Sequence, residues 1–387
     1  MASYTKISKD NWQVVVSLGY GPDGKKDRVK KQGFLKKGDA EKYVTDLLNK
    51  KEHGYIMGFT SNILFKDFVL EWFEDYKSIS LAITTRACYI GRINKHIIPQ
   101  LGRYKLNEIN NVIIQRFYNY LINKNKMKPS AAKTVFNILV GCFKYAKKQK
   151  LIYEMPTDID KLKPAAPKIE YWSKEEVNYF LNSIKGTYLF TPVHIAILTG
   201  LRIGEICGLR WCNVDFDNST LSVNNQVVHD RLSKKLILTS QLKTSTSYRQ
   251  ITIPELLVQH LKLIKEESNA KENDFIILDR NGLMPNPRNI SMNFTKAVSK
   301  YKDSLEDIQT KDLNKDFSNY LQLKQISFHG LRHTHATLLI FYGENVKVVS
   351  DRLGHKDVTV TLNSYTHVMS KMKKKTALLL DNIFITQ

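Results

Sequence analysis

The chain has 387 residues and a formal net charge of +22 at pH 7. Its length predicts two or three domains, because one hydrophobic core rarely serves more than about 250 residues. A hydrophobic content of 42% is sufficient for packed cores and excludes a disordered chain. The excess of positive charge favours a polyanionic partner, foremost nucleic acid. The alternative is that the charge serves only solubility.

Cysteines and apolar runs restrict the class further. The four cysteines form no Cys-x-x-Cys pair, so we expect neither a disulfide scaffold nor a structural zinc site. No apolar run reaches the length of about 18 residues that a membrane span needs, and the first residues lack the apolar segment of a signal peptide. We therefore expect a cytoplasmic protein with reduced thiols and no membrane partner.

The first domain, expected over residues 1–57, is predicted to be a small β-sheet followed by a helix. Trp12–Leu18 and Arg28–Leu35 are typical of strands, Gly19–Lys25 of a turn, and a helix begins at Gly38. The second strand and its turn are strongly basic, and a basic strand suits a DNA groove. Its candidate DNA-binding residues are Lys25, Lys26, Arg28, Lys30 and Lys31. The alternative is a solvated edge strand that lysines protect from further pairing.

Residues 62–156 are predicted to form an all-helical domain. An aromatic and aliphatic face beginning at Phe65 predicts the first helix, and the second is expected to stop at Pro99. A third helix is expected over Val112–Asn123, and a fourth begins after Pro129. The fourth helix ends in a basic run that either complements the helix dipole or contacts phosphate, and this run contains Lys144, Lys147 and Lys148.

Residues 157–170 are rich in proline and are predicted to be a linker to a third domain at 171–387. Ser173 and Glu176 form a capping box that begins the first helix of this domain. Residues 221–228, 235–242 and 248–254 predict a three-stranded meander within a mainly helical α+β domain, and 301–325 a partly helical surface insertion.

Three short motifs in the third domain carry chemically active residues. The first is Leu198-Thr-Gly-Leu-Arg202-Ile-Gly-Glu205, and the second is His329-Gly-Leu-Arg332-His-Thr-His. The third runs from Leu353-Gly-His355 to Tyr365-Thr-His367. On a helix, His329 and Arg332 lie at i and i+3, so both face one pocket. Two guanidinium groups from separate elements would clamp one phosphate and stabilise the charge of its transition state, and they would make Tyr365 a plausible nucleophile beside a histidine base.

The histidines of these motifs leave a metal site as an alternative. The set comprises His329, His333, His335, His355 and His367. Glu205 is the obvious nearby carboxylate in the sequence, and no His-Glu-x-x-His motif is present. His333 and His335 would point to opposite sides of a helix, so the five rings cannot converge on one ion. We therefore expect no metal and no other cofactor.

The motifs together resemble the tyrosine recombinase (phage integrase) family. The Thr-Gly-Leu-Arg-x-Gly-Glu, His-x-x-Arg, Leu-Gly-His and Tyr-x-His boxes occur in family order between about residues 173 and 370. The helical segment is similar to the family's core-binding domain, and the N-terminal sheet is similar to the arm-binding domain of integrases from temperate phages and conjugative transposons.

This resemblance implies a role for each residue of the predicted site. Arg202 and Arg332 would clamp the phosphate, His329 would handle a proton, and His355 would bond the scissile phosphate. Tyr365 would attack and form a 3′-phosphotyrosine link with release of a 5′-hydroxyl, without metal or ATP.

The family also uses a hairpin lysine that protonates the leaving oxygen, and Lys243 matches it, with Ser247 and Arg249 in its flank. Leu242 stands where many relatives have proline, and Lys234 and Lys235 are competing candidates. The resemblance implies that Glu205 buttresses the arginines.

The function that follows is an integrase that integrates and excises a mobile element or prophage through a Holliday junction. Its expected partners are double-stranded DNA with core-type and arm-type sites, a homotetramer, an excisionase and a host DNA-bending protein, in the nucleoid of a bacterial host. Alternatives are a chromosome-dimer resolving or inverting recombinase, a type IB topoisomerase, and a DNA-binding regulator without catalysis. The apolar tail within Met369–Gln387 is expected to pack on a neighbouring subunit or on its own.

Overall fold

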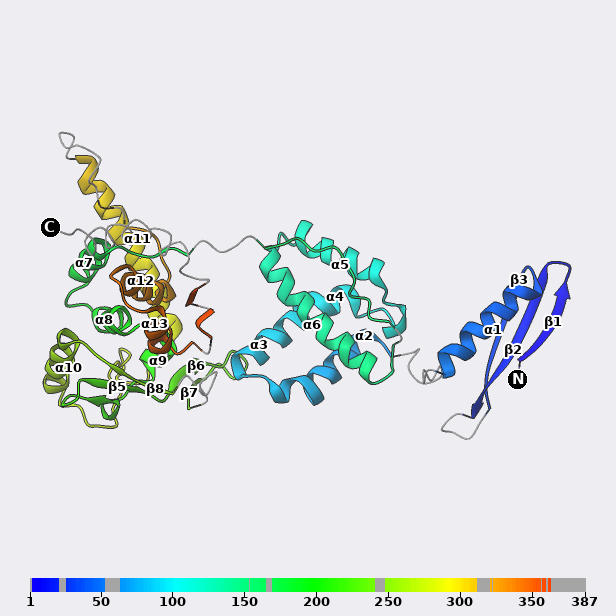
Figure 1. Cartoon of the computed structure of the whole chain (residues 1–387), viewed down its shortest axis with the longest axis horizontal. Helices are drawn as coiled ribbons and strands as arrows, with labels where there is room; N and C mark the ends of the chain where they lie inside the picture. The colour runs from blue at the N-terminus through cyan, green and yellow to red at the C-terminus, as the bar shows by residue number, and fades with distance from the viewer. Residues whose placement is uncertain are drawn as a thin grey trace, which may run out of the picture. The chain divides into compact units, whose positions relative to one another are not determined.

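The computed structural model describes residues 2–20, 26–52, 63–152, 154–164, 169–240, 248–311, 321, 323–355, 357–359 and 361–362. The chain divides into two units, Met1–Ala166 and Pro167–Gln387, and this division falls inside the segment predicted to be a linker (Figure 1). Lys25, Lys243, Ser247, Tyr365, His367 and the tail from Met369 lie outside the described residues.

The N-terminal part is a three-stranded antiparallel sheet with a helix on one face (Figure 1). Its elements are β1 (Ala2–Ser8), β2 (Asn11–Tyr20), β3 (Lys26–Phe34) and α1 (Lys37–Glu52). The core comes from strand residues that alternate across the sheet and from the apolar stripe of α1, namely Val14, Val16, Ala40, Val44 and Leu47. The prediction of two strands was incomplete. The sequence of β1, ASYTKIS, is mostly polar and exposed, so it carries little hydrophobic alternation.

The middle part is all-helical, as predicted. Its α-helices are α2 (Phe65–Glu71), α3 (Ile83–Arg92), α4 (Ile98–Leu101), α5 (Asn111–Asn123) and α6 (Pro129–Lys148). The other helical segments are the π-helical η1 (Trp72–Lys77) and η3 (Ile93–Ile97) and the 3₁₀-helical η2 (Ser78–Ser80) and η4 (Leu106–Glu108). Phe65, Trp72 and Phe143 lie in its core.

The predicted helix end at Pro99 was wrong. The helix runs on from α3 through η3 into α4, and the N–H of Ile98 donates to the carbonyl of Ile93. Pro99 lies in the first turn of α4. The wider π-turn before it changes the hydrogen-bond spacing, which accommodates a residue without an N–H.

The second unit is mainly helical and carries small antiparallel sheets. Its helices are α7 (Lys174–Ser183), α8 (Phe190–Thr199), α9 (Ile203–Cys207), η5 (Trp211–Asn213), α10 (Glu255–Ser268), α11 (Pro287–Lys311), α12 (Phe328–Phe341) and α13 (Val346–Leu353). The capping box that was predicted before α7 is present, since Ser173 N donates to Glu176 Oε2 over 2.8 Å and Glu176 N donates to Ser173 Oγ over 3.3 Å. The segment predicted as an insertion begins inside α11, and 312–320 lie outside the described residues.

The strands of this unit differ from the predicted meander. Its strands are β4 (Val214–Asp215), β5 (Thr220–Val223), β6 (Gln226–His229), β7 (Leu236–Thr239) and β8 (Arg249–Thr252). The three-stranded sheet has the order β4-β5-β8, and β6 and β7 form a separate hairpin. The predicted single strand over 221–228 is divided at Asn224 and Asn225, because asparagine has low strand propensity. The backbone there lies so close to Gly208 that a Cβ at Gly208 would be 3.0 Å from the carbonyl carbon of Asn225.

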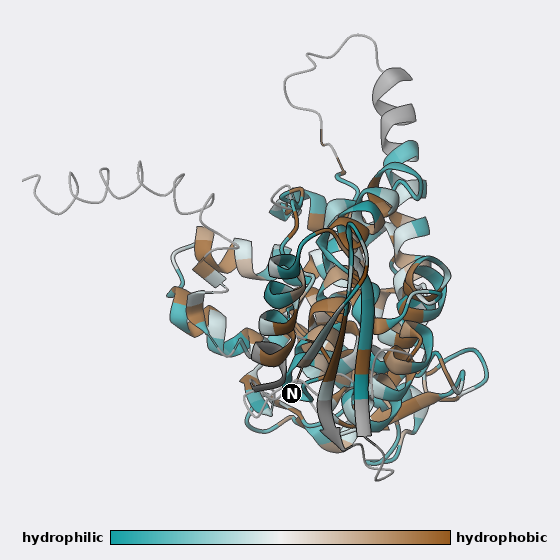
Figure 2. Cartoon of the chain, turned by 90° about the vertical axis from the view of Figure 1, so that its right-hand side faces the viewer, coloured by the Kyte–Doolittle hydropathy of each residue, from teal (hydrophilic) through white to brown (hydrophobic). Residues whose placement is uncertain are grey.

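The core of the second unit is aromatic where helices from distant parts of the sequence meet. Trp172 and Phe180 lie with ring centroids 4.9 Å apart, and Phe294 lies 5.4 Å from Phe180 and 5.3 Å from Phe328. Hydrophobic and hydrophilic residues alternate along the helices, as amphipathic packing requires (Figure 2). Among the described residues, no helix has the length and apolarity to span a membrane.

Candidate active site

The predicted site begins at a sharp turn between α8 and α9. Gly200 ends α8 with φ of +70°, and a Cβ there would lie 2.6 Å from the ring of His335. Glycine is therefore required both by the backbone conformation and by the space. This turn delivers Arg202 as the N-cap residue of α9, with extended backbone.

Glu205 holds Arg202 in place. The N–H of Arg202 donates to Glu205 Oε2 over 2.9 Å, and its Nη1 donates to Oε1 over 2.8 Å. The side chain of Glu205 is 2% exposed, whereas that of Arg202 is 34% exposed. Arg202 is thus anchored from behind and open to solvent in front, which is the arrangement that a phosphate ligand needs. Glu205 buttresses Arg202 as predicted.

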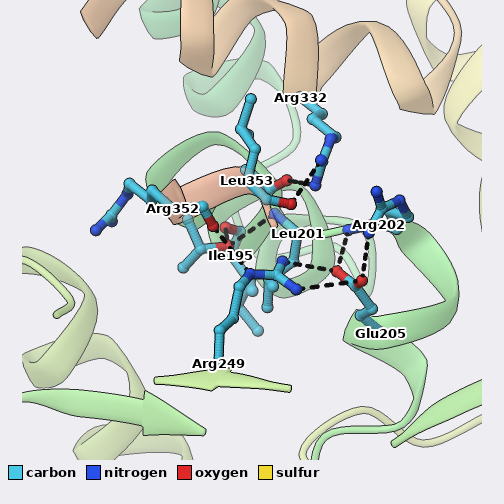
Figure 3. Close-up of polar contacts among 10 residues, drawn as sticks. Ile195, Leu201, Arg202, Glu205, Arg249, Arg332, Arg352 and Leu353 are labelled. Atoms are coloured by element: carbon cyan, nitrogen blue, oxygen red, sulfur yellow. Dashed lines mark hydrogen bonds and ion pairs between the residues drawn. The ribbon is translucent and has the colours of Figure 1, made fainter. Parts of the chain in front are cut away.

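Arg332 lies on α12 and is almost fully buried. Its Nη1 donates to the carbonyl of Gly200 over 2.9 Å, and its Nη2 donates to the carbonyl of Leu353 over 2.7 Å. These carbonyls belong to the turns that precede Arg202 and His355. The guanidinium group therefore ties two separate parts of the site to α12 (Figure 3).

The histidines lie around the same arginines. His329 and His333 are one turn apart on α12, with ring centroids 5.0 Å apart. Solvent reaches part of the His329 side chain. Partial burial of the ring, followed by electrostatic repulsion from the neighbouring His333, Arg332 and Arg202, lowers the pKa of His329. A lowered pKa leaves the ring neutral at pH 7, with one ring nitrogen unprotonated.

His355 follows α13 after Gly354, which has φ of +68°. Its Nδ1 lies 2.8 Å from Thr361 Oγ1, so that ring nitrogen has a partner within the protein. Burial, followed by the charges of Arg332 and Arg202, lowers the pKa of His355 to about 4. His355 is therefore also neutral at pH 7.

His335 has a structural environment instead. Its Nδ1 lies 2.7 Å from the carbonyl of Ile197, and its Nε2 accepts from Arg352 Nε over 3.2 Å. Both ring nitrogens are engaged inside the fold, and burial lowers its pKa to about 3. The described residues contain no cluster of His, Cys, Asp or Glu fit to hold a metal.

Two arginines of this region were not predicted to take part in it. Arg249, at the start of β8, donates to Glu205 and to the carbonyl of Arg352. Arg352 donates to the carbonyls of Leu198 and Thr252. The sequence carried one signal for Arg249, its place in the flank of Lys243. Arg352 had none, because its partners are distant in the chain.

The predicted DNA-binding residues of β3 divide between the two faces of the sheet. Val14 and Val15 of β2 pair with Lys31 and Lys30, respectively, and Val14 is buried under α1. Lys31 lies on the helix side, with Nζ 4.4 Å from the ring centroid of Tyr43. Arg28 and Lys30 are exposed on the other face. Lys26 lies in β3, but its side chain is not described. Lys144, Lys147 and Lys148 are exposed on the last turns of α6.

The second unit thus brings together an arginine positioned by a turn, a second, buried arginine and histidines that are neutral at pH 7. Residues 171–372 match the Phage integrase family, which is half of the chain, so the chain belongs to this family. Residues 64–122 match the phage integrase N-terminal SAM-like domain, and residues 3–51 match the Arm DNA-binding domain. The predicted fold class is confirmed. The chain is a tyrosine site-specific recombinase of the kind that serves mobile elements.

Individual relatives support this assignment. The chain is 28% identical to a tyrosine recombinase XerC-like protein of Caldanaerobacter subterraneus, across 99% of both chains. It is also 28% identical to the ICEBs1 integrase of Bacillus subtilis, across 75% of this chain and 76% of that one. Its fold is similar to that of the Tn1549 transposon integrase in complex with transposon right end DNA, with a TM-score of 0.67 and 20% identity over 81% of this chain and 99% of that one.

Proposed function

We propose that Tyr365 is the nucleophile and that its hydroxyl oxygen attacks the scissile phosphorus of DNA. A Tyr365 Oη–P bond forms and the P–O5′ bond breaks, which leaves a 3′-phosphotyrosine and a free 5′-hydroxyl. Arg202 and Arg332 bond the non-bridging oxygens and stabilise the charge that develops on them. The phosphotyrosyl bond conserves the energy of the phosphodiester, so a new 5′-hydroxyl restores the DNA without ATP.

Two protons move in this step. The phenolic proton passes to the neutral ring of His329, since a tyrosine hydroxyl with a pKa near 10 needs a base at neutral pH. Lys243 donates a proton to the leaving 5′-oxygen. His355 bonds the phosphate through Nε2, with the hydroxyl of Thr361 as the partner of Nδ1. In the second step the same groups act in the reverse direction.

The carrying observation is that Arg202, His329, Arg332 and His355 meet although they come from α9, α12 and the turn after α13. Among the described groups that act on the pKa of His329, Glu205 is the acidic one, and two arginines already neutralise it. Such a site attracts an anion and supplies by its cations the stabilisation that a metal supplies elsewhere.

A suicide substrate tests this proposal. Protein is incubated in EDTA with a DNA site nicked so that the cleaved end diffuses away, and covalent adducts are separated on a denaturing gel. Wild type and Tyr342→Phe, which alters an exposed tyrosine after α12, should give an adduct, whereas Tyr365→Phe should give none. An adduct in Tyr365→Phe would refute Tyr365 as the nucleophile. Absence of the wild-type adduct in EDTA would restore the metal alternative.

We further propose the arrangement of the whole reaction. Residues 1–57 bind arm-type sites, 62–156 bind core-type sites, 157–170 link them to the catalytic domain at 171–387, and four subunits exchange strands through a Holliday junction. Support comes from the lambda integrase, whose solved tetramer bound to a Holliday junction has 16% identity and a TM-score of 0.53 with this chain. An excisionase and a host DNA-bending protein would set direction at the bacterial nucleoid, and the tail from Met369 would pack on a neighbouring subunit.

Truncation tests this last part. A chain that ends at about residue 370 should still bind a single core site but fail to assemble on paired sites in gel-shift and light-scattering measurements. Unchanged assembly would show that the tail packs on its own subunit. Removal of residues 1–57 should abolish binding to arm-type DNA and leave core-site cleavage intact.

A further inference from the structure

Arg249 bonds two parts of the site from a buried position. Its side chain is 7% exposed. Nη2 donates to Glu205 Oε2 over 3.0 Å, Nη1 donates to Oε1 over 3.4 Å, and Nε donates to the carbonyl of Arg352 over 2.9 Å (Figure 3). The two Nη donors to Glu205 form an end-on, bidentate fork with the carboxylate.

Glu205 thus lies between two arginines of unequal exposure. Each of its oxygens accepts one hydrogen bond from Arg202 and one from Arg249. Burial of the carboxyl would raise its pKa, but the charge and hydrogen bonds of Arg249, followed by the charge of Arg202, outweigh this and lower it. The carboxylate is therefore ionised, and the three charges, two positive and one negative, sum to +1.

The net positive charge of this group determines how strongly Arg202 attracts the phosphate of a substrate. Without Arg249, the buried carboxylate would be neutralised by Arg202 alone, and the pair would present a net charge of zero. A charge in a poorly solvated site acts strongly on its neighbours, so this difference bears directly on the stabilisation of an anionic transition state. Arg202 would also be drawn towards Glu205 and away from its open side.

The position of Arg249 in the fold is fixed independently of Glu205. A Cβ on Gly354, the residue before His355, would lie 3.1 Å from Arg249 Nη1. Arg249 thus packs against the turn that carries His355, while its Nε donates to the carbonyl of Arg352 in the last turn of α13. These contacts with the backbone hold the guanidinium group beside Glu205.

We propose that Arg249 is a positioning residue that neutralises Glu205, so that the charge of Arg202 stays available to the scissile phosphate. The inference rests on the proposed role of Arg202 and assigns to Arg249 no contact with DNA. It separates two arginines that share one carboxylate into a buried one that balances the charge and an accessible one that binds the substrate.

The test compares single-turnover cleavage of two nicked substrates, one with the ordinary scissile phosphate and one with an uncharged methylphosphonate. Removal of one preorganised electrostatic contribution costs about 100-fold in rate, so we expect that loss for Arg249→Gln on the phosphate. On the methylphosphonate the loss should be under about tenfold, because less negative charge needs stabilisation. An equal loss on both substrates, with a lower unfolding temperature, would mean that Arg249 is only structural.

Two further variants separate the role of the charge from any effect on stability. Arg249→Lys keeps the charge and should retain most of the rate. In a Glu205→Gln background the charge that needs balancing is gone, so Arg249→Gln should reduce cleavage less in that background than in wild type. An equal reduction in both backgrounds, or a lysine variant as slow as the glutamine variant, overturns the proposal. Arg210→Gln, which removes an arginine stacked 5.0 Å from Phe275, controls for lost net charge.

Failure of this inference and failure of the proposed function give different results in the same assay. If Arg202→Ala and Tyr365→Phe both cleave at the wild-type rate, the proposed site itself is wrong. If both of these variants are inactive while Arg249→Gln cleaves normally on the phosphate, only the role of Arg249 is wrong.

Discussion

Arg332 of the catalytic unit and Lys30 of the N-terminal sheet are both cations expected to meet DNA, yet their surroundings differ. Arg332 is buried and donates to two backbone carbonyls, of Gly200 and Leu353. Lys30 is exposed on the open face of a strand. The positive charge of Arg332 is held in a fixed position, as stabilisation of a transition state requires. The positive charge of Lys30 is solvated and suits attraction of the phosphate backbone of DNA. The difference predicts how sensitive each region is to a change that keeps the charge.

The largest effect should come from Arg332→Lys. A lysine ammonium cannot donate as a planar fork to both carbonyls, so the turns before Arg202 and His355 lose their common tie. We expect a loss of about 1000-fold in single-turnover cleavage, at the upper end for a lost electrostatic group. Lys30→Arg, the reverse exchange on the sheet, should leave cleavage and binding almost unchanged. Similar small effects of the two exchanges would remove the distinction between the regions.

The next effect concerns the turn that holds Arg202. In Gly200→Ala the new Cβ meets His335 and Leu353 and the backbone is strained, so the unfolding free energy should fall by about 3 kcal/mol. Gly186 has a similar φ of +77° but open space around it. Gly186→Ala therefore isolates the strain alone and should cost about 1 kcal/mol. Denaturant unfolding measures both, and equal losses would contradict the packing argument.

Acid should destabilise the catalytic unit through its neutral histidines. The pKa of His335 is lowered to about 3 in the fold, so between that value and about 6.5 the unfolded chain binds more protons than the folded one. The stabilisation is complete above about pH 6.5 and is lost as the pH falls towards the folded value. Unfolding midpoints from pH 7 to pH 4 should fall less steeply in His335→Gln than in wild type. Superimposable profiles would show that His335 does not titrate in this way.

The smallest effects are expected on the sheet. Arg28→Ala and Lys30→Ala should each reduce the slope of log affinity for arm-type DNA against log salt by about one, as for one lost phosphate contact. Lys31→Ala should change this slope less, because Lys31 lies over Tyr43 on the helix side. Salt titrations by fluorescence anisotropy measure all three. Equal slopes for the three variants would mean that lysines and arginines on both faces of the sheet contact DNA equally.

The sequence predicted those parts of the fold that local patterns determine. Helix periodicity predicted α5 almost to the residue, Pro129 marked the start of α6, and Ser173 with Glu176 predicted the start of α7. The polar strand β1 and the π-turn before Pro99 were missed, because neither leaves a hydrophobic pattern. The strand division at Asn224 and Asn225 was missed as well, although the low strand propensity of asparagine was a local signal for it.

The same limit applies to the site. The motifs predicted Arg202, His329, Arg332 and His355 as one group, and the structure brings these residues together. The motifs said nothing of how the group is held. Arg249 bonds Glu205 from β8, and Arg352 reaches Leu198 and Thr252 from α13. Such contacts between distant segments arise only from tertiary folding, and a single sequence carries no periodicity that reports them.

The most direct test of the central claim is to identify the amino acid that becomes joined to DNA. Adduct trapped on a suicide substrate in EDTA is digested with trypsin and nuclease, and the modified peptide is sequenced by mass spectrometry. The account predicts a nucleotide attached through its 3′-phosphate to Tyr365, with no adduct formed by Arg332→Lys within the time of a wild-type turnover. Attachment to another residue, or through a 5′-phosphate, would contradict it.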